Sequence, residues 1–156
     1  MAETDPLELE GEVAADFLEE FLDVADLDGD LDIELSGGRV YISVNSDGEN
    51  NLTSVSDPEV VAALQEVLRL AVQNKTGEMS RLILDIAGSR EARAGQLKEI
   101  AKRAMEKAAD SGASQHLKPM SSYERKIVHD FVGESGFHSE SEGEGRSRHI
   151  VISQAD

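Results

Sequence analysis

The residues best suited to chemistry lie in one stretch near the C-terminus. Arg125 and His129 stand four positions apart in the segment SSYERKIVHDF, residues 121–131. On a helix this spacing places both side chains on one face, one turn apart. An arginine can hold a phosphate through two parallel hydrogen bonds, and a histidine can act as a general base or donate a proton to an anion. The pair alone leaves three interpretations open: a catalytic couple, a nucleic-acid clamp or a charged surface.

Other patterns argue against an enzyme, a metal site or a cofactor. No nucleophile elbow, phosphate-binding loop or dinucleotide fingerprint occurs in the chain. The four histidines include no pair at a chelating helical spacing. The run DLDGDLDIE begins like a calcium-binding loop at Asp26, but its sixth and twelfth positions are Leu31 and Gly37. That loop needs glycine and a carboxylate there. We therefore expect no catalytic residue, no metal and no cofactor.

Charge is distributed unevenly along the chain, whose formal net charge is −17. Residues 1–60 hold 18 Asp and Glu against one basic residue, Arg39. Residues 81–126 hold ten Lys and Arg against six acids. Because charge interactions are screened over roughly 10 Å in physiological salt, a basic face in the second half can still attract a polyanion.

The expected compartment is the cytoplasm, without membrane insertion. The chain has no cysteine, which excludes a disulfide framework. Its start, MAETDPLELEGEV, lacks the basic and apolar regions of a secretory signal. No run approaches the roughly 18 apolar residues of a membrane span.

Hydrophobic periodicity predicts an α+β protein with two small units joined by a long helix. Residues 1–11 are expected to form a flexible acidic tail. The first unit, 12–86, should contain a helix from Glu12 with either Phe17 and Phe21 or Leu18 and Leu22 facing the core. A hairpin follows around Gly37-Gly38, then a helix from Asp57-Pro58 to Gly77, then the strand RLILDI.

The second unit, 89–154, is expected to begin with the long helix, capped by Ser89 and ended by Gly112. A short strand precedes Pro119. Ser121 and Glu124 form a capping box for the helix that carries Arg125. Two closing strands, FHSES and RHIVIS, flank a glycine-rich turn.

The residues around Arg125 and His129 form an ordered pattern over about 40 residues. This pattern resembles the R-3-H domain, a small α+β module named for an arginine and a histidine separated by three residues. The matching segments are Lys118-Pro119-Met120, Glu124-Arg125, His129, Ser141-Glu142-Gly143-Glu144, Arg148 and Ile150-Val151-Ile152.

The resemblance implies binding of single-stranded nucleic acid. Arg125 would hold a phosphate, and His129 would donate to phosphate or stack. Positive charge would come from Lys118, Arg148, Arg146 and Lys126. Supporting charge would come from the long helix, through Arg90, Arg93, Lys98 and Lys102. The family commonly has proline and an aromatic residue where this chain has Arg146-Ser147, so one base-stacking platform is missing. The alternative role for Arg125 and His129 is helix capping or buried hydrogen bonding.

The order of a KH-like unit, a long helix and an R-3-H domain resembles the Jag (KhpB, SpoIIIJ-associated) family of bacterial proteins. When this chain is aligned with that family, the loop that binds nucleic acid, usually Gly-Lys-Arg-Gly, falls on Val55, Ser56, Asp57 and Pro58. Small residues let a backbone approach phosphates closely. Valine blocks that approach and aspartate repels the ligand, so we expect this unit to keep its fold without its own RNA grip.

The resulting hypothesis is a bacterial, non-enzymatic protein that binds single-stranded RNA, or single-stranded DNA, mainly through its R-3-H domain. The resemblance implies post-transcriptional regulation linked to the cell envelope or division, with a small KH-domain protein as a partner. The alternative is a protein–protein adaptor in which nucleic-acid binding has decayed.

Overall fold

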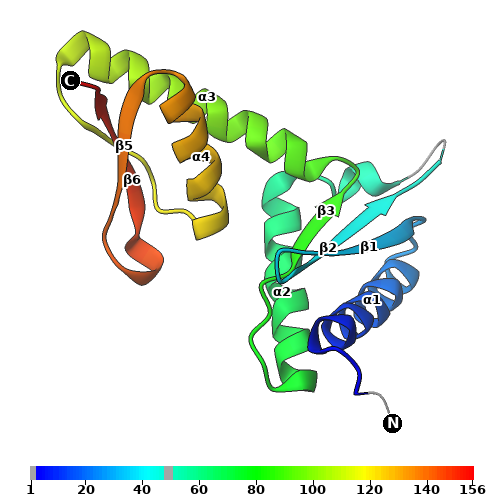
Figure 1. Ribbon diagram of the computed structural model, residues 1–156. Coiled ribbons are helices and arrows are strands. Elements are labelled where there is room, and N and C mark those ends of the chain that lie inside the picture. Colours follow the sequence, from blue (N-terminus) through cyan, green and yellow to red (C-terminus); the bar gives the residue numbers. More distant parts are fainter. Residues whose placement is uncertain (1–2, 48–50) are drawn as a thin grey trace. The chain divides into compact units, whose positions relative to one another are not determined.

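The computed structural model describes residues 3–47 and 51–156, which divide into two units (Figure 1). Unit 1 is Met1–Arg90 and unit 2 is Glu91–Asp156. The boundary falls in the first turn of α3 (Ser89–Ser111), the predicted long helix. Helices and strands occur in both units, which confirms the predicted α+β class.

Unit 1 opens with α1 (Pro6–Val24), which begins six residues before the predicted Glu12. The predicted tail over residues 1–11 is therefore wrong for residues 6–11. The side chain of Asp5 caps the helix by accepting a hydrogen bond of 2.8 Å from the backbone N–H of Leu7. Pro6 occupies the first turn, where its missing N–H costs nothing. The same Asp-Pro signal that predicted α2 was present here as well.

The helix buries the second of its two predicted faces. Leu18 and Leu22 are buried together with Ala14, whereas Phe17 and Phe21 are only partly buried against the same core. Val24 is 84% exposed and takes no part in the core.

The predicted hairpin is present as β1 (Asp30–Ser36) and β2 (Arg39–Asn45). Its turn is Gly37-Gly38, and both residues have positive φ, of 58° and 72°. Glycine adopts this conformation without steric cost, as a two-residue hairpin turn requires. The strand β3 (Ile83–Ile86) pairs in parallel with β2, so the sheet order is β1-β2-β3.

The central strand β2 supplies most of the buried sheet residues, while β1 is an exposed edge. Val40, Ile42 and Val44 are buried as their alternation predicts. Ile33 and Leu35 of β1 are exposed at 42% and 43%. Their side chains therefore remain partly open to solvent on this edge strand.

The second helix, α2 (Pro58–Thr76), has the predicted bounds. Asp57 caps its N-terminus and Gly77 ends it with φ of +79°, the left-handed conformation typical of a helix C-terminus. A short 3-10 helix, η1 (Leu52–Ser54), precedes it and buries Leu52 completely. The residues Val61, Leu64, Leu68 and Val72 complete the core of unit 1.

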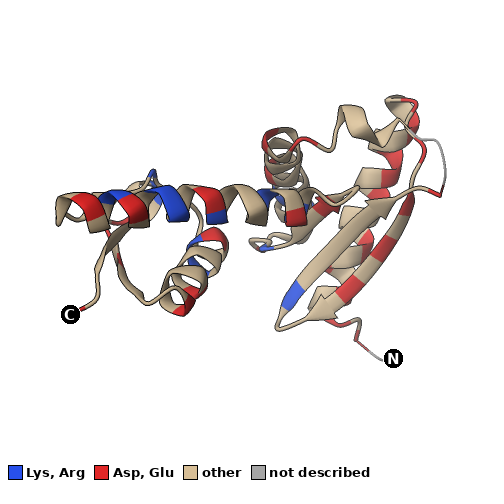
Figure 2. Ribbon diagram, turned by 90° about the horizontal axis from the view of Figure 1, so that it is seen from above, with Lys and Arg blue, Asp and Glu red and all other residues tan. Residues whose placement is uncertain are grey.

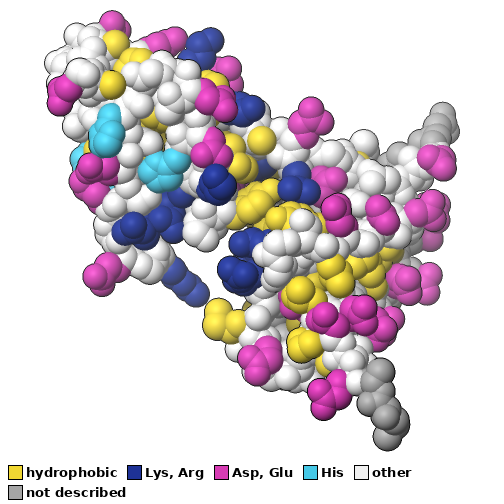
Figure 3. Space-filling model, viewed as in Figure 1, with side chains coloured by type: hydrophobic (Ala, Val, Ile, Leu, Met, Phe, Trp, Pro, Cys, Tyr) yellow, Lys and Arg dark blue, Asp and Glu magenta, His cyan; other side chains and the backbone are white. Residues whose placement is uncertain are grey.

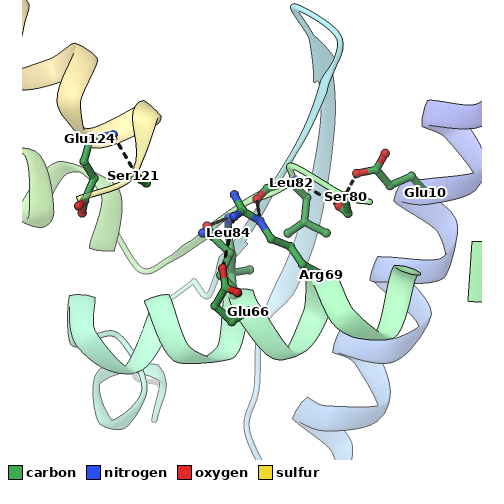
Figure 4. A network of polar contacts seen from close by, with 9 residues as sticks. Glu10, Glu66, Arg69, Ser80, Leu82, Leu84, Ser121 and Glu124 are labelled. Atoms are coloured by element: carbon green, nitrogen blue, oxygen red, sulfur yellow. Dashed lines mark hydrogen bonds and ion pairs between the residues drawn. The ribbon is translucent and has the colours of Figure 1, made fainter. Parts of the chain in front are cut away.

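Polar contacts attach the segment before β3 to both helices (Figure 4). The Ser80 hydroxyl donates to the Glu10 carboxylate on α1 and accepts from the backbone N–H of Leu82 at 3.2 Å. Arg69 on α2 donates through Nε to the carbonyl oxygen of Leu82 at 2.9 Å and contacts Glu66 at 3.4 Å. These contacts satisfy backbone groups of Leu82, which lies just before the paired residues of β3.

The start of α3 differs from its predicted cap. The Asp85 carboxylate accepts from the backbone N–H of Arg90 at 2.9 Å, so it caps the helix from the end of β3. The Ser89 hydroxyl instead accepts from the Ile86 N–H at 2.9 Å and donates to Asp85 at 3.2 Å. Ser89 therefore supports the cap and does not supply it.

Unit 2 packs two helices against one face of an antiparallel sheet of order β4-β6-β5. Its core joins residues of α3, α4 and β6: Leu97, Ala101, Ala104, Met105, Val128, Val132, Ile150 and Ile152. The remaining elements are β4 (Gln115–His116), α4 (Ser122–Glu134), β5 (Phe137–Glu142), η2 (Gly145–Ser147) and β6 (His149–Gln154).

The other face of this sheet is covered by none of the described helices of unit 2 and is called the open face below. Ile150 and Ile152 face the core, so His149 and Val151, which alternate with them, face the open side. On β5 the less exposed Ser139 alternates with the exposed His138 and Glu140 in the same way. None of the described helices is long and apolar enough to cross a membrane.

Candidate nucleic-acid interface

The helix α4 is positioned by the predicted serine cap, although only half of the capping box forms. The Ser121 hydroxyl accepts from the backbone N–H of Glu124 at 3.2 Å. The Glu124 carboxylate does not return to Ser121; it accepts from Nε of Arg93 at 2.7 Å. This ion pair ties α3 to the first turn of α4 and thereby orients the helix that carries Arg125 and His129.

His129 lies between two hydroxyls of β5. Its Nδ1 is 2.7 Å from the Ser139 hydroxyl and its Nε2 is 2.8 Å from the Ser141 hydroxyl. A neutral imidazole has one donor and one acceptor nitrogen. One serine therefore accepts the ring proton while the other donates its own. Both ring nitrogens are occupied, so His129 joins α4 to β5 and has no nitrogen left for a phosphate.

The charge state of His129 agrees with this arrangement. Burial lowers the pKa of His129 below its ordinary value of 6.5, and the nearby charge of Arg125 lowers it further, with a smaller contribution from Arg148. Asp130 opposes these effects. The imidazole is accordingly neutral at physiological pH.

Arg125 carries an unpartnered donor. Its Nε is buried and has no hydrogen-bond partner among the described residues. Buried donors are nearly always satisfied, and an exception calls for an explanation such as a ligand. The side chain is half-buried, one turn before His129. Arg125 is therefore the strongest candidate for an anion contact in this unit.

The turn between β5 and β6 holds Arg146 and Arg148. Nη1 of Arg148 donates to the carbonyl oxygen of Gly143 at 2.8 Å and so closes the turn. Gly143 has φ of +87°, and a Cβ there would lie 3.0 Å from the carbonyl oxygen of Ser147. Only glycine fits this position. Arg146 is exposed in η2, and Lys and Arg side chains gather over this end of unit 2 (Figure 3).

Lys118 lies beside the start of β6. The backbone N–H of Leu117 donates to the carbonyl oxygen of Ile150 at 2.9 Å, and that of Met120 donates to the carbonyl oxygen of Arg148 at 3.3 Å. These bonds hold the segment 117–120 alongside β6, so the exposed Lys118 and the half-buried Arg148 come from adjacent backbones. Arg125, Arg148 and Lys118 all belong to unit 2.

Most of the remaining predicted basic residues contact other side chains. Lys126 pairs with Asp130 on the exposed side of α4, at 3.1 Å. Arg93 pairs with Glu124. Arg90 belongs to unit 1, where its guanidinium lies 4.9 Å from the ring centre of Tyr41. Lys98 lies 5.9 Å from the ring centre of Phe131, while Lys102 is exposed. Acidic residues also alternate with basic ones along α3 (Figure 2).

The predicted degenerate loop, Val55 to Pro58, leads from η1 into α2, with Asp57 as the N-cap and Pro58 as the first residue of the helix. Val55 packs against the core of unit 1, and the Ser56 hydroxyl donates to the carbonyl oxygen of Thr53 at 3.2 Å. The Asp57 carboxylate accepts from the N–H of Glu59 at 2.9 Å, while Pro58 has no N–H. A helix N-terminus attracts anions through its free N–H groups, and here a carboxylate already occupies that position.

Sequence reasoning missed Ser139 and Ser141 as partners of the central histidine. Their alternation in FHSES did place them on one face of the strand. Nothing in the sequence revealed that this face lies against His129, because the contact depends on how α4 packs on β5.

The sequence of this chain is similar to those of known proteins. Residues 95–154 match the family model of the R-3-H domain. The "RNA-binding protein KhpB" of Clostridium symbiosum is 28% identical over 142 residues, which cover 90% of this chain and 64% of the relative. The protein of the same name from Lactiplantibacillus plantarum is 27% identical over 130 residues, 83% of this chain and 40% of the relative. The protein of the same name from Bacillus subtilis is 32% identical over 98 residues, which cover 61% of this chain and 47% of the relative.

These alignments carry two consequences. The chain spans between 40% and 64% of the length of these relatives. An alignment of 142 residues also exceeds the length of unit 2 and therefore includes unit 1.

Proposed function

Because this chain belongs to the Jag (KhpB) family and carries an R-3-H domain in unit 2, we propose that it is a bacterial RNA-binding protein. Single-stranded RNA would be held mainly by unit 2. Arg125 contacts a phosphate, and Lys118, Arg148 and Arg146 add positive charge around it. The observation that carries this proposal is the buried Nε of Arg125, unpartnered among the described residues. His129 acts as a positioning residue that fixes α4 against β5.

The distribution of charge supports unit 2 as the binding surface. Residues 1–90 hold 21 acids and five basic residues, whereas residues 91–156 hold 11 acids and ten basic residues. Unit 1 therefore repels a polyanion, and Asp and Glu dominate its ribbon (Figure 2). Because screening limits this repulsion to roughly 10 Å, it lowers the affinity of unit 2 without abolishing binding.

The cap at the start of α2 argues against a second RNA grip in unit 1. A bound phosphate would have to displace the Asp57 carboxylate from the N–H of Glu59. The displaced carboxylate would still repel the phosphate. The family pattern has small and basic residues at these positions, which would attract it. We assign this unit a scaffolding or partner-binding role.

The wider biological role follows the family resemblance. We propose post-transcriptional regulation linked to the cell envelope or division, in the cytoplasm, with a small KH-domain protein as a partner. Single-stranded DNA is a competing ligand, because a phosphate contact by Arg125 does not read the sugar.

The test is fluorescence anisotropy with a labelled single-stranded RNA at low salt. A hydrogen bond to a charged group contributes about 1.5–3 kcal/mol, so Arg125→Ala should weaken binding about 10- to 100-fold. The matched control is Lys126→Ala, on the same helix but paired with Asp130, which should change affinity less than about threefold. Asp57→Asn keeps the helix cap and removes a negative charge, so its affinity should be equal or slightly higher.

The salt dependence gives a second measurement. About four phosphate contacts on a single strand predict a slope of log K against log salt of roughly −3, and loss of one contact should reduce it by about 0.7. An unchanged slope and affinity in Arg125→Ala would contradict the assignment.

A protein–protein adaptor is the second candidate, favoured by the self-capped loop of unit 1 and by the missing aromatic residue at 146–147. Absence of wild-type binding to RNA and DNA at low salt would decide for the adaptor. Loss of intact oligonucleotide on incubation would instead indicate a nuclease.

A further inference from the structure

Three potential metal ligands meet on the open face of the unit 2 sheet. His116 comes from β4, Glu142 from β5 and His149 from β6. One ligand atom of each residue lies within 4.8 Å of the others. Glu142 and His149 are directly opposite each other in the β5–β6 pairing, and the imidazole ring centres of His116 and His149 are 5.2 Å apart.

The hydrogen bonds of the two histidines define which ring nitrogen of His149 carries the proton and which one faces His116. Nδ1 of His149 is 3.0 Å from the carbonyl oxygen of Ser147. A carbonyl only accepts, so Nδ1 carries the proton and Nε2 keeps a free lone pair. That Nε2 is 3.0 Å from Nδ1 of His116. Metal-binding histidines typically have their other nitrogen held by a carbonyl or carboxylate in this manner, because the bond sets the tautomer and the ring orientation.

The distances are close to those of a coordinated ion. Bonds of about 2.0–2.1 Å from a tetrahedral Zn²⁺ place neighbouring ligand atoms roughly 3.3 Å apart. The nitrogen pair at 3.0 Å already has nearly this separation. Glu142 is exposed, so rotation of its side chain can bring an oxygen closer. His116 would have to move its proton from Nδ1 to Nε2, which is a change of tautomer and not of charge.

We propose that His116, Glu142 and His149 form a binding site for a divalent transition-metal ion, with Zn²⁺ as the best match. Two imidazoles and one carboxylate suit this class of ion, whereas Ca²⁺ and Mg²⁺ prefer oxygen ligands. Water fills the fourth position. The sequence alone did not reveal this site, because its ligands come from three strands and from positions up to 33 residues apart.

The ion would tie all three strands of the sheet together. The strand β4 is two residues long and pairs only with β6 in the described sheet. A bond from His116 through the ion to Glu142 joins β4 to β5, which lies on the far side of β6. Zn²⁺ should therefore stabilise unit 2.

The site lies on the opposite face of the sheet from His129 and the helix that carries it. Ser139 and Ser141 of β5 point toward His129 and α4, so Glu142 points to the other side. The proposal therefore does not rest on the RNA-binding function, and loss of the metal ligands should leave the contacts of His129 intact.

The decisive experiment is calorimetric titration of the full chain with Zn²⁺, using protein from which any polyhistidine tag has been removed. We expect one ion per chain with a Kd on the order of micromolar, and a loss of at least about tenfold in His116→Ala, His149→Ala and Glu142→Gln. The matched control is His138→Ala, an exposed histidine on the same face that contacts Glu140 at 3.1 Å. It should keep the wild-type affinity within about twofold.

Competition with Ca²⁺ tests whether the acidic residues of unit 1 are the true ligands. A hundredfold excess of Ca²⁺ should leave Zn²⁺ binding unchanged, because a histidine site discriminates against it. Displacement by Ca²⁺ would overturn the proposal. Equal losses in His138→Ala and His149→Ala, or a wild-type Kd above about 1 mM, would also overturn it.

A measurement on the wild type covers the case in which a variant fails to fold. The nitrogen-15 shifts of the imidazoles should change on addition of Zn²⁺ at Nδ1 of His116 and Nε2 of His149. The shifts of His129 should stay constant. Changes confined to other histidines would contradict the site.

Discussion

The hydrogen bonds of His129 allow a quantitative test of its role as the link between α4 and β5. The change is His129→Ala, which removes the contacts to Ser139 and Ser141 at 2.7 Å and 2.8 Å. A typical intramolecular hydrogen bond contributes about 1 kcal/mol. The site is only partly buried, so water replaces part of the loss. We expect unit 2 to lose about 1–2 kcal/mol of unfolding free energy.

That loss should be visible in thermal unfolding. For a domain of 60–100 residues, 1 kcal/mol lowers Tm by about 4–8 °C, so the expected decrease is about 4–16 °C. Because the chain divides into two compact units, the assay must report on unit 2 alone. Hydrogen exchange of the β5 and β6 amides, followed by NMR, meets this requirement.

A double-mutant cycle separates the hydrogen bond from the loss of packing. Ser139→Ala should cost less in the His129→Ala background than in the wild type, by at least about 0.5 kcal/mol. The control is His138→Ala, an exposed histidine on the neighbouring position of β5, which should cost less than about 0.5 kcal/mol. Equal effects of His129→Ala and His138→Ala, or a zero coupling energy, would refute the assigned role.

Two further predictions concern stability. The pKa of His129 is lowered in the folded state by burial and by Arg125, so the unfolded state binds its proton at higher pH. Unit 2 should therefore lose stability as pH falls below about 6.5, and His129→Gln should remove most of that loss in NMR-detected unfolding. Gly29→Ala places a Cβ 2.5 Å from Cγ1 of the fully buried Val44, and should destabilise unit 1 by about 1–3 kcal/mol in denaturant titration. An unchanged midpoint would show that β2 can shift to accommodate a methyl group.

Local sequence signals identified most of the elements because their causes are local. Asp57-Pro58 and Gly77 mark the ends of α2, and Gly37-Gly38 sets the hairpin turn. Each depends on the dihedral preferences or hydrogen-bonding groups of neighbouring residues. Asp5-Pro6 is the same signal and marks the start of α1.

Exposure and side-chain partners could not be predicted in the same way. Ile33 and Leu35 alternate with polar residues in β1 but are exposed at 42% and 43%, because exposure depends on which elements cover the strand. Lys126 and Arg93 were expected as positive charges for a ligand, and the structure pairs both with carboxylates. Such pairs depend on the packing of separate helices or on the rotamers of long side chains.

The sequence by itself determined the order of elements, the location of the excess acid in the first half, and the ordered pattern around Arg125 and His129. These properties follow from local composition and spacing. Only the tertiary structure decided that His129 is held between two serines, that the Nε of Arg125 has no partner among the described residues, and that His116, Glu142 and His149 meet on one face. The physical reason is that hydrogen bonds and metal ligands require approach within a few ångströms, and the packing of strands and helices distant in sequence sets that approach.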